Sequence, residues 1–314
     1  MTATTRILVS SETDDLVGQE LFSQLDSVEV IPYDPTTTTL DERQRQAEIF
    51  VPPYRGTNRP MALMAQMPNL QMVQITAAGT DEWVNEIPDG VVLVGARGAH
   101  AGPVSEWVLS AALTQYRQWP ALVRFQDQHI WAHRRFDADT LRGKRALIVG
   151  AGSIGSAVAR LFAAFGAGST LVARSSRDGV YAASEMPGLI RGHDIVVITA
   201  PLNAETTNLV DEKFLSAMAD GAMLINAGRG KIVDTDALVA EVRSGRLRAA
   251  LDVTEPEPLP PNHPLWSCPG VIISPHSART VPGTNALCYS VAAQQVGEFL
   301  AGKVPSNAAI RIKY

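Results

Sequence analysis

Three glycines in the stretch ALIVGAGSIG have the spacing of a phosphate-binding turn. They directly follow an apolar run and stand at the mouth of a helical pattern. In such a turn the first glycine permits the sharp bend, the second lets the backbone approach a pyrophosphate, and the third lets helix and strand pack closely. The N–H groups at the start of the helix would face the phosphates. The strand before the motif and the helix after it predict a dinucleotide site, with contacts at Gly150, Gly152, Ser153, Ile154 and Gly155.

The next strand should end, about twenty residues on, at the group that contacts the adenosine ribose. An NAD site usually has an acid there, since a carboxylate accepts hydrogen bonds from both ribose hydroxyls. This chain instead has Arg174, followed by Ser175, Ser176 and Arg177. Arginine can hold a 2′-phosphate with paired donors, whereas a carboxylate would repel it, so the sequence favours NADP over NAD. In the alternative interpretation both arginines are solvated loop charges and the adenine end is weakly specified.

A second unusual turn holds one arginine between two glycines, in the stretch LINAGRGKIVD. Arg229 follows an apolar run. Gly228 and Gly230 on either side suggest that the backbone turns sharply or lets another group come close. Taken alone, the pattern fits better a tight surface turn with a solvated arginine, so other motifs must decide its role.

Short apolar runs alternate with helical patterns along most of the chain, as in parallel sheets covered on both faces. In the first part these runs are residues 6–10, 28–32, 70–76 and 91–95. After a long helical pattern over residues 103–128, six more follow at 145–150, 170–173, 194–200, 222–226, 248–253 and 271–274. These six describe a doubly wound dinucleotide-binding sheet. Residues 285–302 have the apolar spacing of one more helix.

Length and composition exclude several classes of protein. A chain of 314 residues is expected to form two domains. With 46% hydrophobic and 19% charged residues the composition is that of a globular protein. A net charge of -5 argues against nucleic-acid or anionic-membrane partners. The N-terminal apolar run is too short for a signal peptide, and no window approaches the roughly 18 apolar residues of a membrane span, so a cytoplasmic location is predicted.

The cysteines and one histidine pair predict no metal site. Cys268 and Cys288 stand outside any C-x-x-C pair and are interpreted as incidental or buried thiols of a reducing compartment. His129 and His133 have the i, i+4 spacing that can hold a metal on a helix. They lack the intervening acid of the H-E-x-x-H pattern, and two arginines follow them directly.

Seven motifs occur in a recognisable order: TAAGTDEW, GAHAGPVSEWVL, LRGKRALIVGAGSIG, APLNAETTNLV, INAGRGKIVDTDAL, AALDVTEPEPLPPNHPLW and ISPHSA. Over nearly its whole length the chain resembles the D-isomer-specific 2-hydroxyacid dehydrogenases, which include glyoxylate/hydroxypyruvate reductases and phosphoglycerate dehydrogenase. The resemblance implies an α/β fold with two doubly wound domains. A Rossmann dinucleotide-binding domain, residues 98–278, would be inserted into a smaller flavodoxin-like substrate domain, residues 1–97 with 279–314.

The resemblance also implies catalytic roles. Reduction of a 2-oxo acid requires a cation, a proton donor and a hydride. Arg229 would be the cation, His276 in SPHSA the general acid, and Glu257 its carboxylate partner, because the family's glutamate lies five residues after Asp252. Asp252 itself would face the nicotinamide carboxamide or ribose, and Glu255 would be solvated. Alternatively, His276 is a capped loop histidine and Glu257 a proline-flanked surface acid.

Further contacts are implied for both ligands. Backbone N–H groups around Ala78 and Gly79 would hold the substrate carboxylate, although Gly79 could equally be a plain turn glycine. Pro201 and Ala227 would complete the cofactor site. Because the side chains lining the substrate site come from variable loops, the sequence does not name the substrate.

These observations predict an NADP-dependent oxidoreductase that converts a small 2-oxo acid such as glyoxylate or hydroxypyruvate to the D-2-hydroxy acid. A homodimer is expected through the helix that starts near Pro103, although the apolar residues of that helix could instead be buried within one subunit. The alternative from another class is a nucleotide-sensing, corepressor-like binding protein on the same fold. The presence of Arg229, Glu257 and His276 together favours the enzyme.

Overall fold

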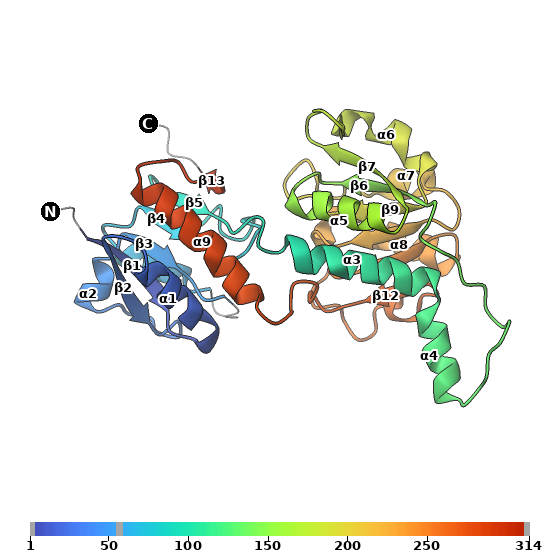
Figure 1. Ribbon diagram of the computed structural model, residues 1–314, viewed down its shortest axis with the longest axis horizontal. Coiled ribbons are helices and arrows are strands. Elements are labelled where there is room, and N and C mark those ends of the chain that lie inside the picture. The colour runs from blue at the N-terminus through green and yellow to red at the C-terminus, as the bar shows by residue number, and fades with distance from the viewer. Residues whose placement is uncertain (1–3, 55–58, 311–314) are drawn as a thin grey trace. The chain divides into compact units, whose positions relative to one another are not determined.

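The computed structural model describes residues 4–54 and 59–310, which form two compact units. Unit 1 comprises Met1–His100 and Val281–Tyr314, and unit 2 comprises Ala101–Thr280. Unit 2 is therefore inserted between two segments of unit 1. Each unit contains its own sheet (Figure 1).

Unit 1 is built on a sheet whose strand order, among the described residues, is β13-β5-β4-β3-β1-β2. Its strands are β1 (Thr5–Ser10), β2 (Val28–Tyr33), β3 (Ile49–Val51), β4 (Met72–Gln74), β5 (Val92–Val94) and β13 (Ala308–Ile310). Its α-helices are α1 (Leu16–Ser23), α2 (Glu42–Arg45) and α9 (Thr284–Leu300). Strands β1 to β5 pair in parallel, and β13 adds to β5 in the antiparallel direction. The order 2-1-3-4-5 is that of a flavodoxin-like doubly wound sheet.

Alternate residues of the unit 1 strands point to opposite faces of the sheet and build two separate cores. On one face Ile7 and Val9 pack with Phe22 of α1 and Tyr289 of α9. Leu8, between them, belongs to the core on the other face. Both faces are covered, which explains why this strand is apolar at successive positions.

Helices α1 and α9 approach closely because Gly18 has no side chain at their contact. A Cβ atom at Gly18 would lie 2.3 Å from the ring of Tyr289. The Tyr289 hydroxyl donates a hydrogen bond to Asp15 Oδ1 at 2.8 Å, and the backbone N–H of Tyr54 donates to the same oxygen at 3.0 Å. Burial raises the pKa of the Asp15 carboxyl above its usual range. This polar cluster ties the C-terminal helix to the N-terminal part of unit 1.

Unit 2 has a parallel sheet whose order, among the described residues, is β12-β11-β10-β9-β6-β7-β8. Its strands are β6 (Arg145–Val149), β7 (Gly168–Ala173), β8 (Val180–Ala182), β9 (Ile195–Ile198), β10 (Met223–Asn226), β11 (Arg248–Leu251) and β12 (Val271–Ile273). Its α-helices are α3 (Ala101–Tyr116), α4 (Trp119–Asp127), α5 (Ser153–Ala164), α6 (Met186–Leu189), α7 (Glu212–Ala217) and α8 (Thr235–Arg243). Counted from β6, the order is the 3-2-1-4-5-6 order of a Rossmann sheet with one further strand.

The unit 2 sheet is also covered on both faces (Figure 1). Ile148 packs with Val108 of α3 and Phe162 of α5 in one core. Its neighbour Leu147 packs on the opposite face, in the core that contains Leu238 of α8. The predicted α/β class with parallel sheets is confirmed.

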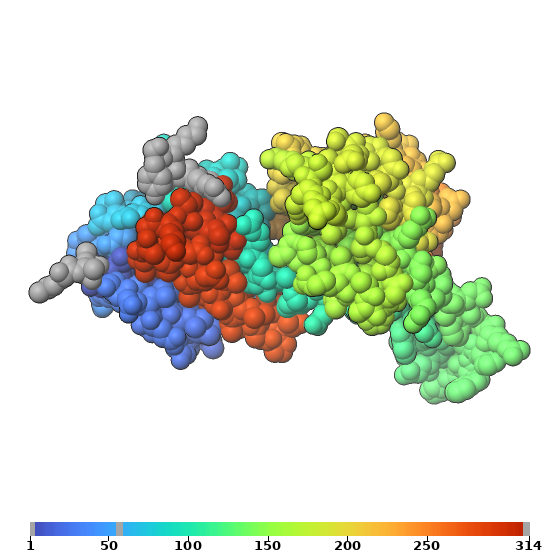
Figure 2. All heavy atoms as spheres, turned by 45° about the horizontal axis from the view of Figure 1, so that its top comes forward, coloured from blue at the N-terminus to red at the C-terminus, as the bar shows by residue number. Residues whose placement is uncertain are grey.

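The continuous helix predicted over residues 103–128 is wrong, because the structure divides it into α3 and α4. Gln118, at the start of α4, has a left-handed backbone with φ of 53°, which no continuous α-helix accommodates. Pro120 follows within the first turn of α4, where its missing N–H costs least. The spacing of apolar residues in the segment does not reveal this break. Figure 2 shows the segment around α4 standing out from the rest of unit 2.

Three strands were not predicted: β3, β8 and β13. Each has only three residues and lies outside the apolar runs from which the other strands were predicted. In the part of the chain that the structure describes, both β8 and β13 lie at the ends of their sheets. The two cysteines are buried thiols. No helix in the described ranges is long and apolar enough to cross a membrane.

Candidate active site and dinucleotide site

The turn after β6 gives each of its three glycines a different physical role. Gly150 has a φ of 113°, and a Cβ atom there would lie 2.5 Å from the backbone N of Ala200. A Cβ atom on Gly155 would lie 2.1 Å from the carbonyl oxygen of Gly150. At Gly152, by contrast, a Cβ atom would meet nothing within 4 Å. The first and third glycines are therefore required by packing, while the second presents bare backbone to open space.

This arrangement fits a dinucleotide pyrophosphate. Gly152 is the N-cap of α5, and its lack of a side chain leaves the first-turn N–H groups of the helix to a ligand. Ser153 and Ile154 form the first residues of that helix. Thr199, at the end of β9, donates from its hydroxyl to the Gly150 carbonyl oxygen at 2.8 Å and so holds the turn.

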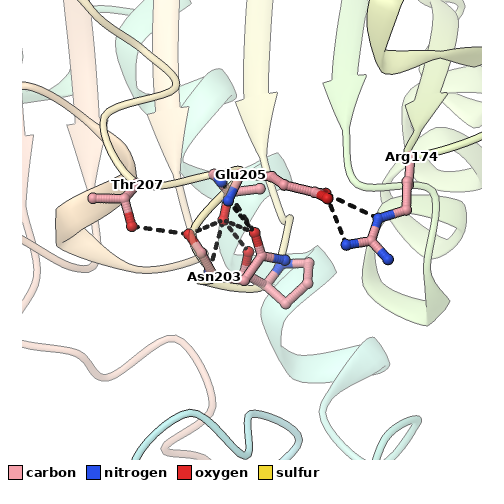
Figure 3. Close-up of polar contacts among 6 residues, drawn as sticks. Arg174, Asn203, Glu205 and Thr207 are labelled. Carbon is pink, nitrogen blue, oxygen red and sulfur yellow. Dashed lines mark hydrogen bonds and ion pairs between the residues drawn. The ribbon is translucent and has the colours of Figure 1, made fainter.

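Both arginines of the turn after β7 make defined contacts. Arg174 donates from Nε to Oε2 of Glu205 at 2.9 Å, its Nη2 lies 2.8 Å from the same oxygen in an ion pair, and Figure 3 shows this pair. Arg177 donates from Nη2 to the carbonyl oxygen of Ala151, inside the glycine turn, at 2.6 Å. Ser175 and Ser176, between them, are exposed. The cationic segment therefore lies against the glycine turn, where the adenosine half of a dinucleotide would be.

The arginine turn after β10 is shaped by a buried asparagine. Asn226 Oδ1 accepts from the backbone N–H of Gly228 at 3.0 Å, and Asn226 Nδ2 donates to the carbonyl oxygen of Arg229 at 3.0 Å. The Arg229 backbone is extended, with φ −141°, and its Nη1 donates to the Gly228 carbonyl oxygen at 3.0 Å. A Cβ atom on Gly230 would lie 1.9 Å from the carbonyl oxygen of Thr254. Close approach of another backbone segment, rather than a left-handed conformation, explains this glycine.

Replacement of Gly230 by alanine is expected to destabilise unit 2 by about 1–3 kcal/mol, because the added methyl group overlaps the Thr254 backbone. Urea unfolding followed by circular dichroism measures the change in free energy. Gly188→Ala is the matched control, since a Cβ atom there meets nothing within 4 Å. Equal stability of the two variants would contradict the close packing of Gly230.

His276 and Glu257 are brought together although 19 residues separate them. His276 Nδ1 and Glu257 Oε1 are 2.6 Å apart. Both side chains are about two-fifths exposed, so the pair remains accessible from solvent. His276 has a left-handed backbone with φ of 51° and its N–H donates to the carbonyl oxygen of Asp252 at 2.8 Å. An imidazole held in this way can take up and release a proton at its other nitrogen.

The Asp252 carboxylate organises the loop that carries His276. Its Oδ1 accepts hydrogen bonds from the Ser274 hydroxyl at 2.6 Å and from the N–H groups of Ser277 and Ala278 at 2.8 and 3.0 Å. Asp252 is buried, with 4% exposure. This aspartate therefore has a structural role in the loop. Its predicted contact with the nicotinamide carboxamide or ribose stays a prediction.

Two positioning residues were missed by the sequence analysis. Thr235, the first residue of α8, donates from its hydroxyl to the carbonyl oxygen of Glu255 at 2.8 Å, which fixes the segment leading to Glu257. Asn226 shapes the arginine turn, and an asparagine that directly precedes a glycine-rich turn is the signal that could have revealed it. Glu255 is half-buried, not solvated as expected.

The predicted residues of unit 2 follow the carboxyl ends of neighbouring strands. Pro201 follows β9, Ala227 and Arg229 follow β10, Asp252 follows β11 and His276 follows β12, and these strands are adjacent in the sheet. Ligands of open parallel sheets bind outside these ends. Ala78 and Gly79 belong to unit 1, where they follow β4 and are half-buried. In the described parts of the chain, no group of three or more His, Cys, Asp or Glu side chains could hold a metal ion.

The chain is similar to known proteins in sequence and in structure. The family model described as D-isomer specific 2-hydroxyacid dehydrogenase, NAD binding domain, matches residues 109–278. Over 260 residues the chain is 34% identical to a glyoxylate reductase of Aeropyrum pernix, covering 78% of each chain. A D-isomer specific 2-hydroxyacid dehydrogenase of Xanthobacter autotrophicus in complex with NADPH and MES is similar in structure, with a TM-score of 0.83, 26% identity and 98% of both chains covered. An NADPH-dependent glyoxylate/hydroxypyruvate reductase of Sinorhizobium meliloti in complex with NADP and sulfate has a TM-score of 0.79, also at 26% identity and 98% coverage of both chains.

The chain belongs to the D-isomer-specific 2-hydroxyacid dehydrogenase family, and the resemblance inferred from the motifs is confirmed. It is an enzyme of the NAD(P)-dependent 2-hydroxyacid dehydrogenase class, with its dinucleotide-binding domain in unit 2.

Proposed function

We propose that this enzyme reduces a small 2-oxo acid of the glyoxylate or hydroxypyruvate type to the D-2-hydroxy acid, with NADPH as its preferred reductant. The observation that carries the proposal is the 2.6 Å contact between His276 Nδ1 and Glu257 Oε1. With Nδ1 engaged by Glu257, Nε2 of the same ring acts on the substrate oxygen in this proposal. The similarity to the glyoxylate reductase of Aeropyrum and the glyoxylate/hydroxypyruvate reductase of Sinorhizobium supports the substrate class.

Three side chains act on the oxo acid in this proposal. Arg229 binds the substrate carboxylate and polarises the oxo oxygen through its paired guanidinium donors. His276 donates the proton that converts this oxygen to a hydroxyl. Glu257 holds the imidazole in orientation and stabilises its positive charge while it is protonated.

The remaining predicted residues position the reactants. When bound, the reduced nicotinamide supplies the hydride to the oxo carbon. The glycine turn after β6 holds the pyrophosphate, and Pro201, Ala227 and Asp252 line the nicotinamide half. We assign unit 1 as the substrate domain, in which the backbone N–H groups of Ala78 and Gly79 hold the substrate carboxylate.

The function is tested by following NADPH and NADH oxidation with a panel of 2-oxo acids. We expect turnover with glyoxylate or hydroxypyruvate, faster with NADPH than with NADH, and formation of the D-isomer where the product is chiral. Absorbance at the nicotinamide band measures the turnover with each cofactor, and chiral chromatography identifies the isomer of the product. Absence of turnover with every 2-oxo acid, by a protein that binds the cofactor, would contradict the assigned reaction.

Replacement of Arg174 by aspartate is expected to lower the NADPH to NADH ratio of kcat/KM by roughly 10- to 100-fold, because charge-assisted hydrogen bonds of about 1.5–3 kcal/mol to the 2′-phosphate are lost. Steady-state kinetics with both cofactors give this ratio. Arg191→Asp makes the same charge change at an exposed position on another turn and should leave the ratio unchanged. A ratio in the Arg174 variant equal to that of the wild type would refute its role.

We also propose that the enzyme forms a homodimer through the α3 and α4 region. Trp119 and Val123 of α4 are 55% and 48% exposed, and Trp131 beyond its end is 90% exposed. Large apolar side chains grouped on a protruding segment are typical of an interface between subunits. Sedimentation equilibrium would give the molecular mass, and a monomer at micromolar concentration would contradict this assignment.

A further inference from the structure

A carboxylate faces the arginine that is expected to hold the adenosine ribose. Arg174 follows β7, and Glu205 lies in the loop after β9. Strand β6, which the glycine turn follows, lies between β7 and β9 in the sheet. Nε of Arg174 donates to Oε2 of Glu205 at 2.9 Å, and Nη2 forms an ion pair with the same oxygen at 2.8 Å (Figure 3). The loop from β9 therefore extends across the carboxyl end of the strand that carries the glycine turn.

The loop that carries Glu205 is held by its own hydrogen bonds, several of which Figure 3 shows. Asn203 Oδ1 accepts from the backbone N–H groups of Glu205 and Thr206 at 2.9 and 3.1 Å. The Thr206 hydroxyl donates to the carbonyl oxygen of Pro201 at 2.7 Å and accepts from the Asn203 N–H at 2.9 Å. The Thr207 hydroxyl donates to the carbonyl oxygen of Asn203 at 2.8 Å. The backbone of Glu205 is thus set in place beside Arg174 independently of the ion pair.

The two charges have opposite preferences for the 2′ position of an adenosine ribose. A carboxylate at the end of this strand accepts hydrogen bonds from a 2′-hydroxyl, whereas an arginine accommodates a 2′-phosphate. In this chain the arginine comes from the strand itself and the carboxylate comes from the neighbouring loop. The side chains are 74% and 64% exposed, so their ion pair is weak and a phosphate can displace it. The displaced carboxylate then stays close to the phosphate and repels it.

We propose that Glu205 is a specificity-determining residue that lowers the affinity for NADP(H) relative to NAD(H) by competing with the 2′-phosphate for Arg174. The inference rests on the proposed function in one respect, the placement of the adenosine ribose at Arg174. On this proposal, a site with two arginines can also accept NADH.

The test is direct binding of each cofactor, measured by the fluorescence of bound NADPH and NADH at low ionic strength. Glu205→Gln is expected to lower the Kd for NADPH about three- to tenfold and to leave the Kd for NADH unchanged or higher, because the amide has no charge to compete with phosphate. Glu205→Asp keeps the charge on a shorter side chain and should lie between the wild type and Glu205→Gln. The gain in NADPH affinity should shrink at high salt, where exposed charges are screened.

Glu212→Gln is the matched control, since it removes the same charge from an exposed position in the first turn of α7. An unchanged ratio of the two Kd values in Glu205→Gln, or the same change of ratio in Glu212→Gln, would overturn the proposal. If the wild type bound neither cofactor, the proposed oxidoreductase function itself would be wrong. If the wild type bound a cofactor but Glu205→Gln left the ratio of Kd values unchanged, only the role of Glu205 would be wrong. Thermal unfolding of each variant, with a Tm expected near that of the wild type, confirms that only an exposed side chain has changed.

Discussion

Replacement of His276 by asparagine is expected to lower kcat for 2-oxo acid reduction by about 10²- to 10⁴-fold, because no proton donor remains for the oxo oxygen. Asparagine is preferable to alanine at this position, since His276 has a left-handed backbone that asparagine tolerates. The hydrogen bond from the residue 276 N–H to Asp252 is kept, so the loop should hold its shape. Stopped-flow measurement of NADPH oxidation gives the rate, and fluorescence titration gives the cofactor Kd.

His263→Asn is the matched control for this variant. His263 caps a short helix through its side chain, and asparagine is a good N-cap residue, so activity should be close to that of the wild type. Glu257→Gln should lower kcat less than His276→Asn, because the amide oxygen can still accept from Nδ1 without stabilising the positive charge. If kcat and cofactor affinity fell by the same factor in His276→Asn, a role as general acid would be wrong.

Replacement of Arg229 by alanine is expected to lower kcat/KM for the oxo acid by about 10²- to 10³-fold or more, because the donors to the developing oxyanion are lost. The Arg229 backbone is extended, a conformation that alanine adopts readily. Asn226 donates its hydrogen bond to the backbone carbonyl oxygen of residue 229, which the substitution keeps. The turn should therefore persist. Arg229→Lys should recover part of the activity, since an ammonium keeps the charge but not the planar pair of donors.

Arg243→Ala serves as the control, because Arg243 is an exposed residue in the last turn of α8. Steady-state kinetics separate the effects on kcat and KM, and unfolding curves report stability. A further test is added guanidinium, which should partly restore the activity of Arg229→Ala but not that of His276→Asn. Normal kcat/KM in Arg229→Ala would leave the proposed reaction without its cation and would refute the assignment.

The two sheets were predictable because a parallel strand that is covered on both faces is apolar at consecutive positions. The glycine turn after β6 was predictable for a similar reason, since its three glycines lie within six residues, and the first and third are required by close packing while the second leaves the backbone open to a ligand. The break at Gln118 was not predictable from apolar spacing, because both helices use the same spacing and one left-handed residue separates them. The three-residue strands β3, β8 and β13 likewise escaped prediction, whereas the equally short β4, β5 and β12 lie within longer apolar runs.

Some features of the site could likewise be predicted from the sequence, and others depend on the tertiary structure. The order of the motifs and the types of residue at strand ends can be read directly from the sequence. They were sufficient to identify the family and to nominate Arg229 and His276. Contacts between separate loops depend on strand order and on how the loops pack. Glu205 reaches Arg174 over 31 residues, and Glu257 reaches His276 over 19, because the strands that carry them are near neighbours in one sheet. No local pattern encodes such a meeting. The family resemblance implied the pairing of Glu257 with His276, whereas the partner of Arg174 became visible only in the folded chain.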